Sequence, residues 1–179
     1  EMSRDLELVR ERNRELGLIS KYDELTGLLN LRGFTEQIKN FCSKSEHQRA
    51  YIICADLDHL KEINDTWGHP AGNFALRSVA NIFNGCLRSQ DVVARTGGDE
   101  FLILLNCQEK NFQDIFRKRV RDACAAFNAE SGKPFLVEVS LGITEFKPSP
   151  ETDIPAIIEH ADKDLYESKK LRKNSVRRP

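Results

Sequence analysis

Apolar residues recur along the chain in two spacings, which predict short strands separated by amphipathic helices. Residues 51–56, 91–94 and 101–105 are short, mostly apolar runs, and runs of this length are typical of strands within a sheet. In residues 137–144 apolar and polar side chains alternate, which predicts a strand with one buried face. The Gly-Gly step at 97–98 separates the second strand from the third and predicts a hairpin, because glycine adopts positive φ without strain.

Further segments carry apolar residues at steps of three and four, the spacing of a helix with one buried face. They cover residues 34–42, 73–87, 111–128 and 154–165. The last of them is expected to begin near Asp153, with Pro155 in its first turn. The alternating order of helices and strands predicts an α+β fold, in which we expect the helices on one face of an antiparallel sheet.

Residues 1–22 differ from the rest, because they are charged and contain no proline. A heptad seam with alternating steps of four and three is formed by Met2, Leu6, Val9, Asn13 and Leu16. This spacing is typical of a coiled coil, where a polar seam residue sets the register. A solvated helix remains an equal alternative, since two heptads are few. We expect a linker helix over residues 1–22 and a globular domain over residues 23–179.

Composition limits the classes of protein that fit. Hydrophobic residues make up 40% and charged residues 31% of the chain, which is typical of a globular domain with a core. The formal net charge of -1 argues against a general nucleic-acid binder. No apolar run has the length of a membrane span, and no signal peptide opens the chain. The five cysteines lack a C-x-x-C pair, so we expect reduced, buried thiols and a cytoplasmic location.

Acidic side chains stand at the ends of two predicted strands. Asp56 ends the first strand, and Asp99 and Glu100 leave the Gly-Gly turn. Side chains alternate along a strand, so Asp99 and Glu100 are expected on opposite sides unless the turn twists them. Carboxylate oxygens are the ligands that Mg²⁺ prefers. In the polar segment that follows the first strand, Asp58 and Asp65 have a simpler interpretation as turn caps, which we favour for Asp65.

Residues 97–101, Gly-Gly-Asp-Glu-Phe, resemble the signature of the GGDEF family, the diguanylate cyclases. Four further blocks are similar to that family in order and spacing. They are D-x-L-T-G-L-x-N at 23–30, D-x-D-x-x-K-x-I-N-D-x-x-G-H at 56–69, R-x-x-D at 88–91, and L-Y-x-x-K at 165–169 with Asn174. The resemblance therefore covers nearly the whole chain.

The resemblance implies a ferredoxin-like βαββαβ core of the nucleotidyl-cyclase and polymerase-palm type, preceded by the linker helix. It implies that two GTP molecules are joined into cyclic di-GMP, with release of two pyrophosphates, across a homodimer. Two Mg²⁺ (or Mn²⁺) ions per active site are expected on Asp56, Asp99, Glu100 and the backbone carbonyl of Leu57. Glu100 is also expected to assist deprotonation of the attacking hydroxyl.

The same resemblance implies sites for substrate and product. Substrate binding is expected from Asn64 and Asn73 on guanine, and from Lys61, Lys169 and Lys173 on the phosphates. Arg88 and Asp91 resemble the family's inhibitory site for cyclic di-GMP, although a local ion pair is the alternative. The linker helix resembles those that connect an upstream sensor to the catalytic domain, so the chain is expected to be part of a longer sensor, for which membrane attachment stays open.

The sequence departs from the family pattern at positions that include Leu31, Leu60, Asn73, Arg172 and Lys173. Asn73 stands where the family has Asp, and an amide offers guanine one acceptor where a carboxylate offers two. Two alternatives therefore stay open beside the cyclase: a silent receptor for GTP or cyclic di-GMP, and a cyclic dinucleotide synthase with relaxed base selectivity. A water or a neighbouring group that supplies the missing acceptor would remove the second. The intact Gly-Gly-Asp-Glu motif favours an active enzyme.

Overall fold

The computed structural model describes residues 20–44, 49–109 and 111–176, and of residues 171–176 only the backbone. The predicted heptad seam lies outside the described residues. The elements follow one another as α2 (Leu31–Lys44), β1 (Ala50–Leu57), α3 (Leu60–Trp67), α4 (His69–Cys86), β2 (Val92–Gly97), β3 (Glu100–Asn106), α5 (Phe112–Ser131), β4 (Val139–Phe146) and α6 (Ile154–Val176).

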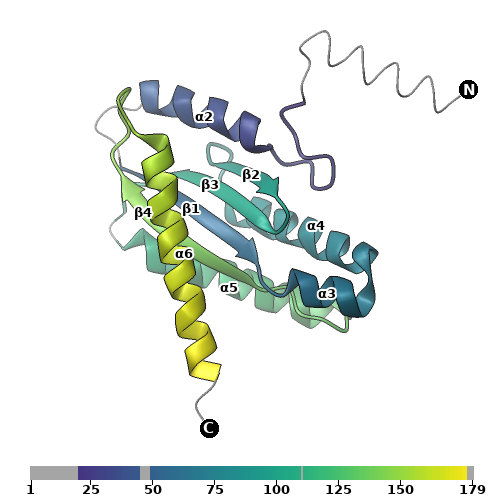
Figure 1. Cartoon of the computed structure of the whole chain (residues 1–179). Coiled ribbons are helices and arrows are strands. Elements are labelled where there is room, and N and C mark those ends of the chain that lie inside the picture. Colours follow the sequence, from purple (N-terminus) through teal and green to yellow (C-terminus); the bar gives the residue numbers. More distant parts are fainter. Residues whose placement is uncertain (1–19, 45–48, 110, 177–179) are drawn as a thin grey trace, which may run out of the picture.

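The four strands form one antiparallel sheet in the order β2-β3-β1-β4 (Figure 1). Helices α3 and α4 connect β1 to β2, and α5 connects β3 to β4, so the element order is the expected βαββαβ. The central strand β1 pairs with β3 on one side and β4 on the other, with Ile53 opposite both Ile103 and Ile143. The predicted α+β, ferredoxin-like fold is therefore confirmed.

Helices cover both faces of the sheet, which corrects the expectation of a single helical layer. Ile53 and Ala55 pack into a core with α4 and α5, whereas Ile52 and Cys54 pack into a second core with α2 and α6. Figure 1 shows α6 crossing in front of the sheet and α5 behind it. The apolar run at 51–56 follows from this arrangement, because a strand buried on both faces needs apolar side chains at every position.

Strand β4 is also buried on both faces, and the prediction of a half-buried strand there was wrong. Ser140, Leu141, Gly142 and Ile143 are all buried. A Cβ atom at Gly142 would lie 2.0 Å from the carbonyl oxygen of Ala161 and 2.3 Å from the amide nitrogen of Leu165. Helix α6 therefore approaches β4 so closely that its backbone fills the space of a side chain.

Side chains and a neighbouring segment bind some of the backbone groups at the two edges of the sheet. On β4, the guanidinium of Arg117 (α5) donates to the carbonyl oxygen of Leu141, and the amide of Ile143 donates to Asp164 Oδ2 (α6) at 2.8 Å. Arg117 also donates to Asp164 at 2.6 Å. On β2, the amide of Arg95 donates to the carbonyl oxygen of Leu29 at 2.8 Å.

Other sequence expectations have mixed outcomes. The five cysteines are buried and none of them forms a disulfide, as expected. Helix α3 occupies residues that the sequence marked only as rich in turns, and it is reached through His59 at a positive φ of 61°. Helix α6 begins where predicted, since Asp153 accepts a hydrogen bond from the amide of Ala156 at 3.1 Å. Within the described part of the chain, no helix has the length and apolarity that a membrane crossing requires.

Candidate active site

The Gly-Gly segment forms a tight turn between β2 and β3. Gly97 pairs with Glu100, so Gly98 and Asp99 are the turn residues, and a bulge lies between Arg95 and Gly97. Gly97 has a φ of 152° and Gly98 a φ of 50°, which glycine adopts more readily than other residues. The turn therefore requires both glycines and delivers Glu100 as the first residue of β3.

Arg95 holds this turn in place, a role that the sequence analysis missed. Its guanidinium donates to the carbonyl oxygen of Gly98 from Nε at 3.0 Å and from Nη2 at 2.7 Å. It also pairs with Asp23 at 2.9 Å, with side chains only 13% and 19% exposed. Burial acts to raise the pKa of Asp23, but hydrogen bonds from Thr26 and Arg95 outweigh it and leave the pKa lowered. The 23–30 block thus anchors the turn that carries Asp99 and Glu100.

Asp56 and Glu100 lie side by side across two strands. They are register partners in the β1–β3 ladder, and the amide of Leu57 donates to the carbonyl oxygen of Asp99 at 2.9 Å. Opposed residues in an antiparallel pair have Cβ atoms roughly 5 Å apart. The sheet therefore brings together the acids that the sequence placed at the ends of separate strands.

The carboxyl of Asp56 is partly buried and lies near other negative charges. Burial raises its pKa, and the negative charges of Asp99 and Asp58 raise it further, while a hydrogen bond from Lys169 acts to lower it. Lys169 Nζ on α6 lies 2.7 Å from Asp56 Oδ1. Like charges at close range disfavour ionisation, and a cation placed among them relieves the repulsion. The local charge therefore favours a bound cation.

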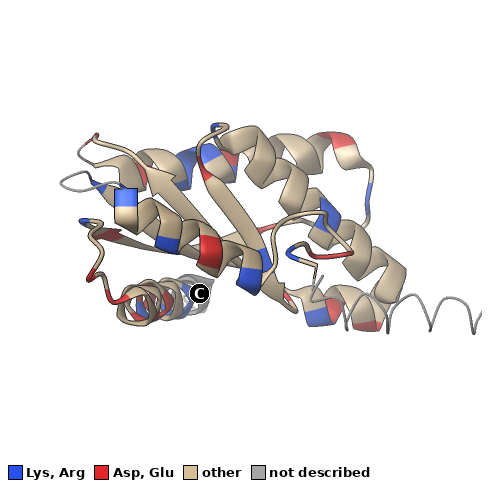
Figure 2. Cartoon of the chain, turned by 90° about the horizontal axis from the view of Figure 1, so that it is seen from above, with Lys and Arg blue, Asp and Glu red and all other residues tan. Residues whose placement is uncertain are grey.

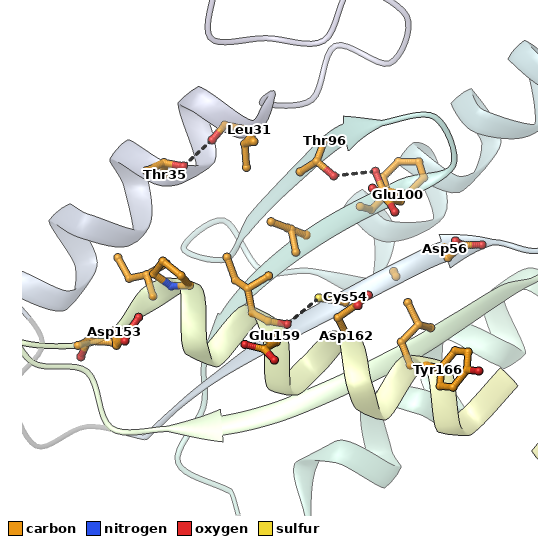
Figure 3. Close-up of a pocket in the computed structure, with 18 of the residues that line it drawn as sticks. Leu31, Thr35, Cys54, Asp56, Thr96, Glu100, Asp153, Glu159, Asp162 and Tyr166 are labelled. Carbon is orange, nitrogen blue, oxygen red and sulfur yellow. Dashed lines mark hydrogen bonds between the residues drawn. The ribbon is translucent and has the colours of Figure 1, made fainter. Parts of the chain in front are cut away.

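A cleft of about 1040 Å³ opens over the sheet between α2 and α6. Figure 3 shows Asp56 and Glu100 toward one end of this cleft and Asp153 toward the other. The apolar lining includes Leu31, Cys54, Leu102, Ile154, Ile158 and Leu165. Burial, and then the charges of Asp162 and Glu100, raise the pKa of the Cys54 thiol to about 12, so the thiol stays protonated. The cleft is thus apolar along its floor and carries carboxylates along its length.

The donor set suits a hard cation, although it is sparse. Asp56, Asp99 and Glu100 offer carboxylate oxygens, the ligand type that Mg²⁺ and Mn²⁺ prefer. No group of three or more acidic, histidine or cysteine side chains in the described part of the chain is arranged to hold a metal ion. The oxygens come instead as a cross-strand pair, Asp56 and Glu100, with Asp99 one residue before Glu100. Any further ligands have to come from the backbone, from water or from substrate.

The residues predicted to read guanine lie on α3 and α4, outside the lining of the cleft. Asn64 Oδ1 is buried, and no residue in the described part of the chain hydrogen-bonds to it. A Cβ atom at Gly72 would lie 1.9 Å from this oxygen. Gly72 therefore makes room for the Asn64 amide, and Asn73 follows it on an exposed turn of α4.

The remaining predicted phosphate contacts have no described partner in the cleft. Lys61 is exposed on α3 and does not line the cleft, and the side chain of Lys173 lies outside the described part of the chain.

Asp58 is held by Ser140, whose hydroxyl donates to its two carboxylate oxygens at 2.8 and 3.0 Å. Asp58 therefore connects the end of β1 to β4. This is a structural role, as in the simpler interpretation of Asp58 given in the sequence analysis.

Arg88 and Asp91 form a local turn at the far end of α4. Asp91 Oδ2 accepts a hydrogen bond from the backbone amide of Arg88 at 2.8 Å, and Arg88 is exposed. Arg119 on α5 lines the same small pocket and donates to the carbonyl oxygen of Cys86 at 3.1 Å. Burial raises the pKa of Asp91, against the Arg88 amide and the charges of Arg88 and Arg119. No sequence pattern indicated Arg119, because its proximity to Arg88 and Asp91 depends on how α5 packs.

Comparison with known proteins decides the family. The sequence model of the family "Diguanylate cyclase, GGDEF domain" matches residues 20–175. The chain belongs to the GGDEF family. This GGDEF domain is 37% identical over 126 residues to diguanylate cyclase A of Treponema denticola, covering 70% of this chain and 34% of that protein. It is 35% identical over 175 residues to diguanylate cyclase DosC of Escherichia coli K12, covering 95% of this chain and 37% of that one. The chain spans about a third of the length of these two relatives.

Solved structures show the same fold. Diguanylate cyclase SiaD of Pseudomonas aeruginosa, in complex with its activator SiaC, matches with a TM-score of 0.74 and 31% identity, over 94% of this chain and 65% of that chain. The coiled coil and GGDEF domain of DgcB from Caulobacter crescentus, in complex with c-di-GMP, matches with a TM-score of 0.72 and 25% identity, over 94% of this chain and 91% of that chain. These likenesses extend over nearly all of this GGDEF domain.

Proposed function

We propose that this GGDEF domain is a diguanylate cyclase, which condenses two GTP molecules into cyclic di-GMP and releases two pyrophosphates. The observation that carries the proposal is the Asp56–Glu100 pair, which stands across two strands at a cleft with Lys169 against Asp56. Two adjacent carboxylates and an ammonium suit the transfer of a nucleotidyl group with pyrophosphate as leaving group. The related proteins named diguanylate cyclases support the same reaction.

In each half-reaction the 3′-hydroxyl of one GTP attacks the α-phosphorus of the other. The new O–P bond replaces the bond to the leaving pyrophosphate, and the hydroxyl proton passes to a base. Glu100 is the candidate base, because its side chain is exposed at the cleft beside Asp56. Asp56, Asp99, Glu100 and the Leu57 carbonyl would hold two Mg²⁺ or Mn²⁺ ions, whose charge would acidify the hydroxyl and stabilise the transition state.

The other residues position the nucleotide. Lys169 and Lys173 on α6, with Lys61 on α3, are proposed to bind phosphate oxygens. Asn64 and Asn73 are proposed to bind the guanine ring. The close approach of Gly72 to Asn64 supports a position for guanine beside α3 and α4. An amide at residue 73 matches guanine less well than a carboxylate, so base selectivity is proposed to be weaker than with Asp.

Product and partner binding complete the proposal. Arg88 and Asp91, together with Arg119, are proposed to bind cyclic di-GMP as a feedback inhibitor, since two guanidinium groups and a carboxylate surround one pocket. Two copies of the domain, each with one GTP, are proposed to face each other in a homodimer. The linker over residues 1–22 is proposed to pass a signal from an upstream sensor. Positively and negatively charged residues are interspersed along the helices in Figure 2. The domain is proposed not to bind nucleic acid, which stays a prediction.

The test is incubation with GTP and Mg²⁺, with pyrophosphate release and product mass measured together. The wild type is expected to form cyclic di-GMP. Glu100→Gln is expected to lose turnover, whereas Glu159→Gln, which alters another carboxylate of the same cleft, is expected to keep it. Binding of GTP without pyrophosphate release from the wild type would contradict the proposal and favour the receptor function.

A further inference from the structure

Lys169 contacts Asp56, one of the residues proposed to hold the divalent cation. Its ammonium lies 2.7 Å from Asp56 Oδ1, and the two side chains are 33% and 14% exposed. Helix α6 fixes this position, because the buried Leu165 one turn earlier packs against β4 at Gly142. The contact between Lys169 and Asp56 therefore depends on the packing of α6 against β4.

The acids around Lys169 make this position favourable for a cation. Asp56 stands opposite Glu100 in the sheet, and the charges of Asp99 and Asp58 act on its carboxyl. The lysine supplies one positive charge to this group, whereas a divalent cation would supply two. Both cations seek the same carboxylate oxygen, and a full ammonium at contact distance repels a second cation.

We propose that Lys169 and the divalent metal compete for Asp56, and that the triphosphate of GTP resolves the competition by drawing Lys169 away. This inference rests on the proposed function, because the phosphates in question are those of the substrate. A triphosphate offers the ammonium several anionic oxygens in place of one carboxylate. Once Lys169 has moved, Asp56 is free to bind the metal.

The competition couples the two binding events. Metal binds Asp56 weakly while Lys169 is paired with it, and nucleotide raises the affinity for metal at this site. Coupling between binding sites is reciprocal, so metal raises the affinity for nucleotide by the same factor. The site thereby assembles with metal and GTP together rather than with metal alone.

The experiment measures Mn²⁺ binding to the whole chain without nucleotide, by the paramagnetic resonance signal of free Mn²⁺. Lys169→Met is expected to bind Mn²⁺ about tenfold more tightly than the wild type, because the screening of these partly exposed charges limits the gain. Lys169→Gln, a second uncharged side chain, is expected to do the same. Lys170→Met is the matched control, since Lys170 lies over the ring of Tyr166 and is not part of the cleft lining. It is expected to leave Mn²⁺ affinity unchanged.

Two further measurements locate the effect. Adding Asp56→Asn to Lys169→Met is expected to remove the gain. With the α,β-methylene analogue of GTP present, the advantage of Lys169→Met is expected to vanish or reverse, because the lysine then serves the phosphates. Unchanged or weaker Mn²⁺ binding by both Lys169 variants, or a gain that survives Asp56→Asn, would overturn the inference.

This inference and the proposed function fail separately. Turnover of GTP by the wild type, with no gain in Mn²⁺ affinity in the Lys169 variants, would leave the cyclase and remove the competition. A gain in Mn²⁺ affinity without any turnover of GTP would leave the competition for Asp56 and remove the cyclase.

Discussion

Gly142→Ala is expected to be one of the most disruptive single-methyl substitutions in the molecule. The new Cβ would lie 2.0 Å from the carbonyl oxygen of Ala161 and 2.3 Å from the amide nitrogen of Leu165. The first distance is about 1 Å short of the 3.0 Å below which Cβ contacts essentially never occur. Both obstacles are backbone atoms, so no side chain can rotate to relieve the clash, and the whole of α6 has to move away from β4.

The size of the effect follows from these contacts. Overpacking a well-filled core costs about 1–3 kcal/mol, and a clash with rigid helix backbone belongs at the upper end. For a domain of this size, each kcal/mol lowers Tm by about 2–4 °C, so a fall of roughly 6–12 °C is expected. The shift of α6 would also displace Lys169 from the place where it is proposed to bind the phosphates of GTP. Turnover of GTP should therefore fall even at temperatures where the variant is folded.

Gly85→Ala is the matched control for this experiment. Gly85 lies in α4 without a positive φ, and a Cβ there would meet nothing within 4 Å. Because Gly→Ala at a compatible helical position stabilises by about 0.4–1 kcal/mol, Tm should rise by roughly 1–4 °C. Both variants are compared with the wild type by thermal and urea denaturation followed by circular dichroism. A Gly142→Ala protein that melts within a degree of the wild type would refute the close packing of α6 on β4.

Three further predictions concern the proposed chemistry. Glu100→Gln should lower kcat by about 10²-fold or more while Tm stays near that of the wild type, as expected for a general base, and rapid pyrophosphate release by the folded variant would exclude that role. Arg88→Ala should weaken cyclic di-GMP binding in calorimetry and relieve product inhibition without lowering the initial rate, because it removes an exposed cation that is proposed to bind phosphate. Equal binding by the wild type and the variant would place the inhibitory site elsewhere. Asn73→Asp should raise kcat/KM for GTP by roughly 5- to 150-fold, which corresponds to about 1–3 kcal/mol for one restored hydrogen bond. The substitution should also sharpen selection against ATP. Strict use of GTP by the wild type in competition assays, unchanged in the variant, would contradict this prediction.

The sequence predicted the fold well where burial leaves a direct pattern. The apolar run at 51–56 marked the central strand, and the Gly-Gly step marked the β2–β3 turn. Helical spacing shows that one face of a helix is buried, but it does not reveal which face of the sheet that helix covers. Strand β4 was mispredicted for a related reason, because Gly142 and Ser140 look like exposed positions when the helix backbone that covers them lies far along the chain.

The sequence predicted which acids of the candidate site lie together, but it did not predict which residues the cations contact. Asp56 and Glu100 stand at strand ends, so their proximity follows from sheet geometry once the strands are known. The contacts of Arg95 with Asp23 and of Lys169 with Asp56 depend instead on tertiary packing between distant segments. No local pattern encodes such pairs, and a motif comparison names their residues without revealing the partner.

Some backbone groups at the two edges of the sheet are already hydrogen-bonded, and this bears on how two copies would meet in the proposed homodimer. A strand edge with unpaired backbone groups recruits strands from other molecules, and the resulting ladder is slow to come apart. Here Arg117 and Asp164 occupy the backbone groups of Leu141 and Ile143 on β4, and Leu29 occupies the amide of Arg95 on β2. In the proposed homodimer, two copies would therefore meet through side-chain surfaces, and such contacts form and release quickly. Such contacts allow an encounter between two domains to be switched on and off without unfolding either of them.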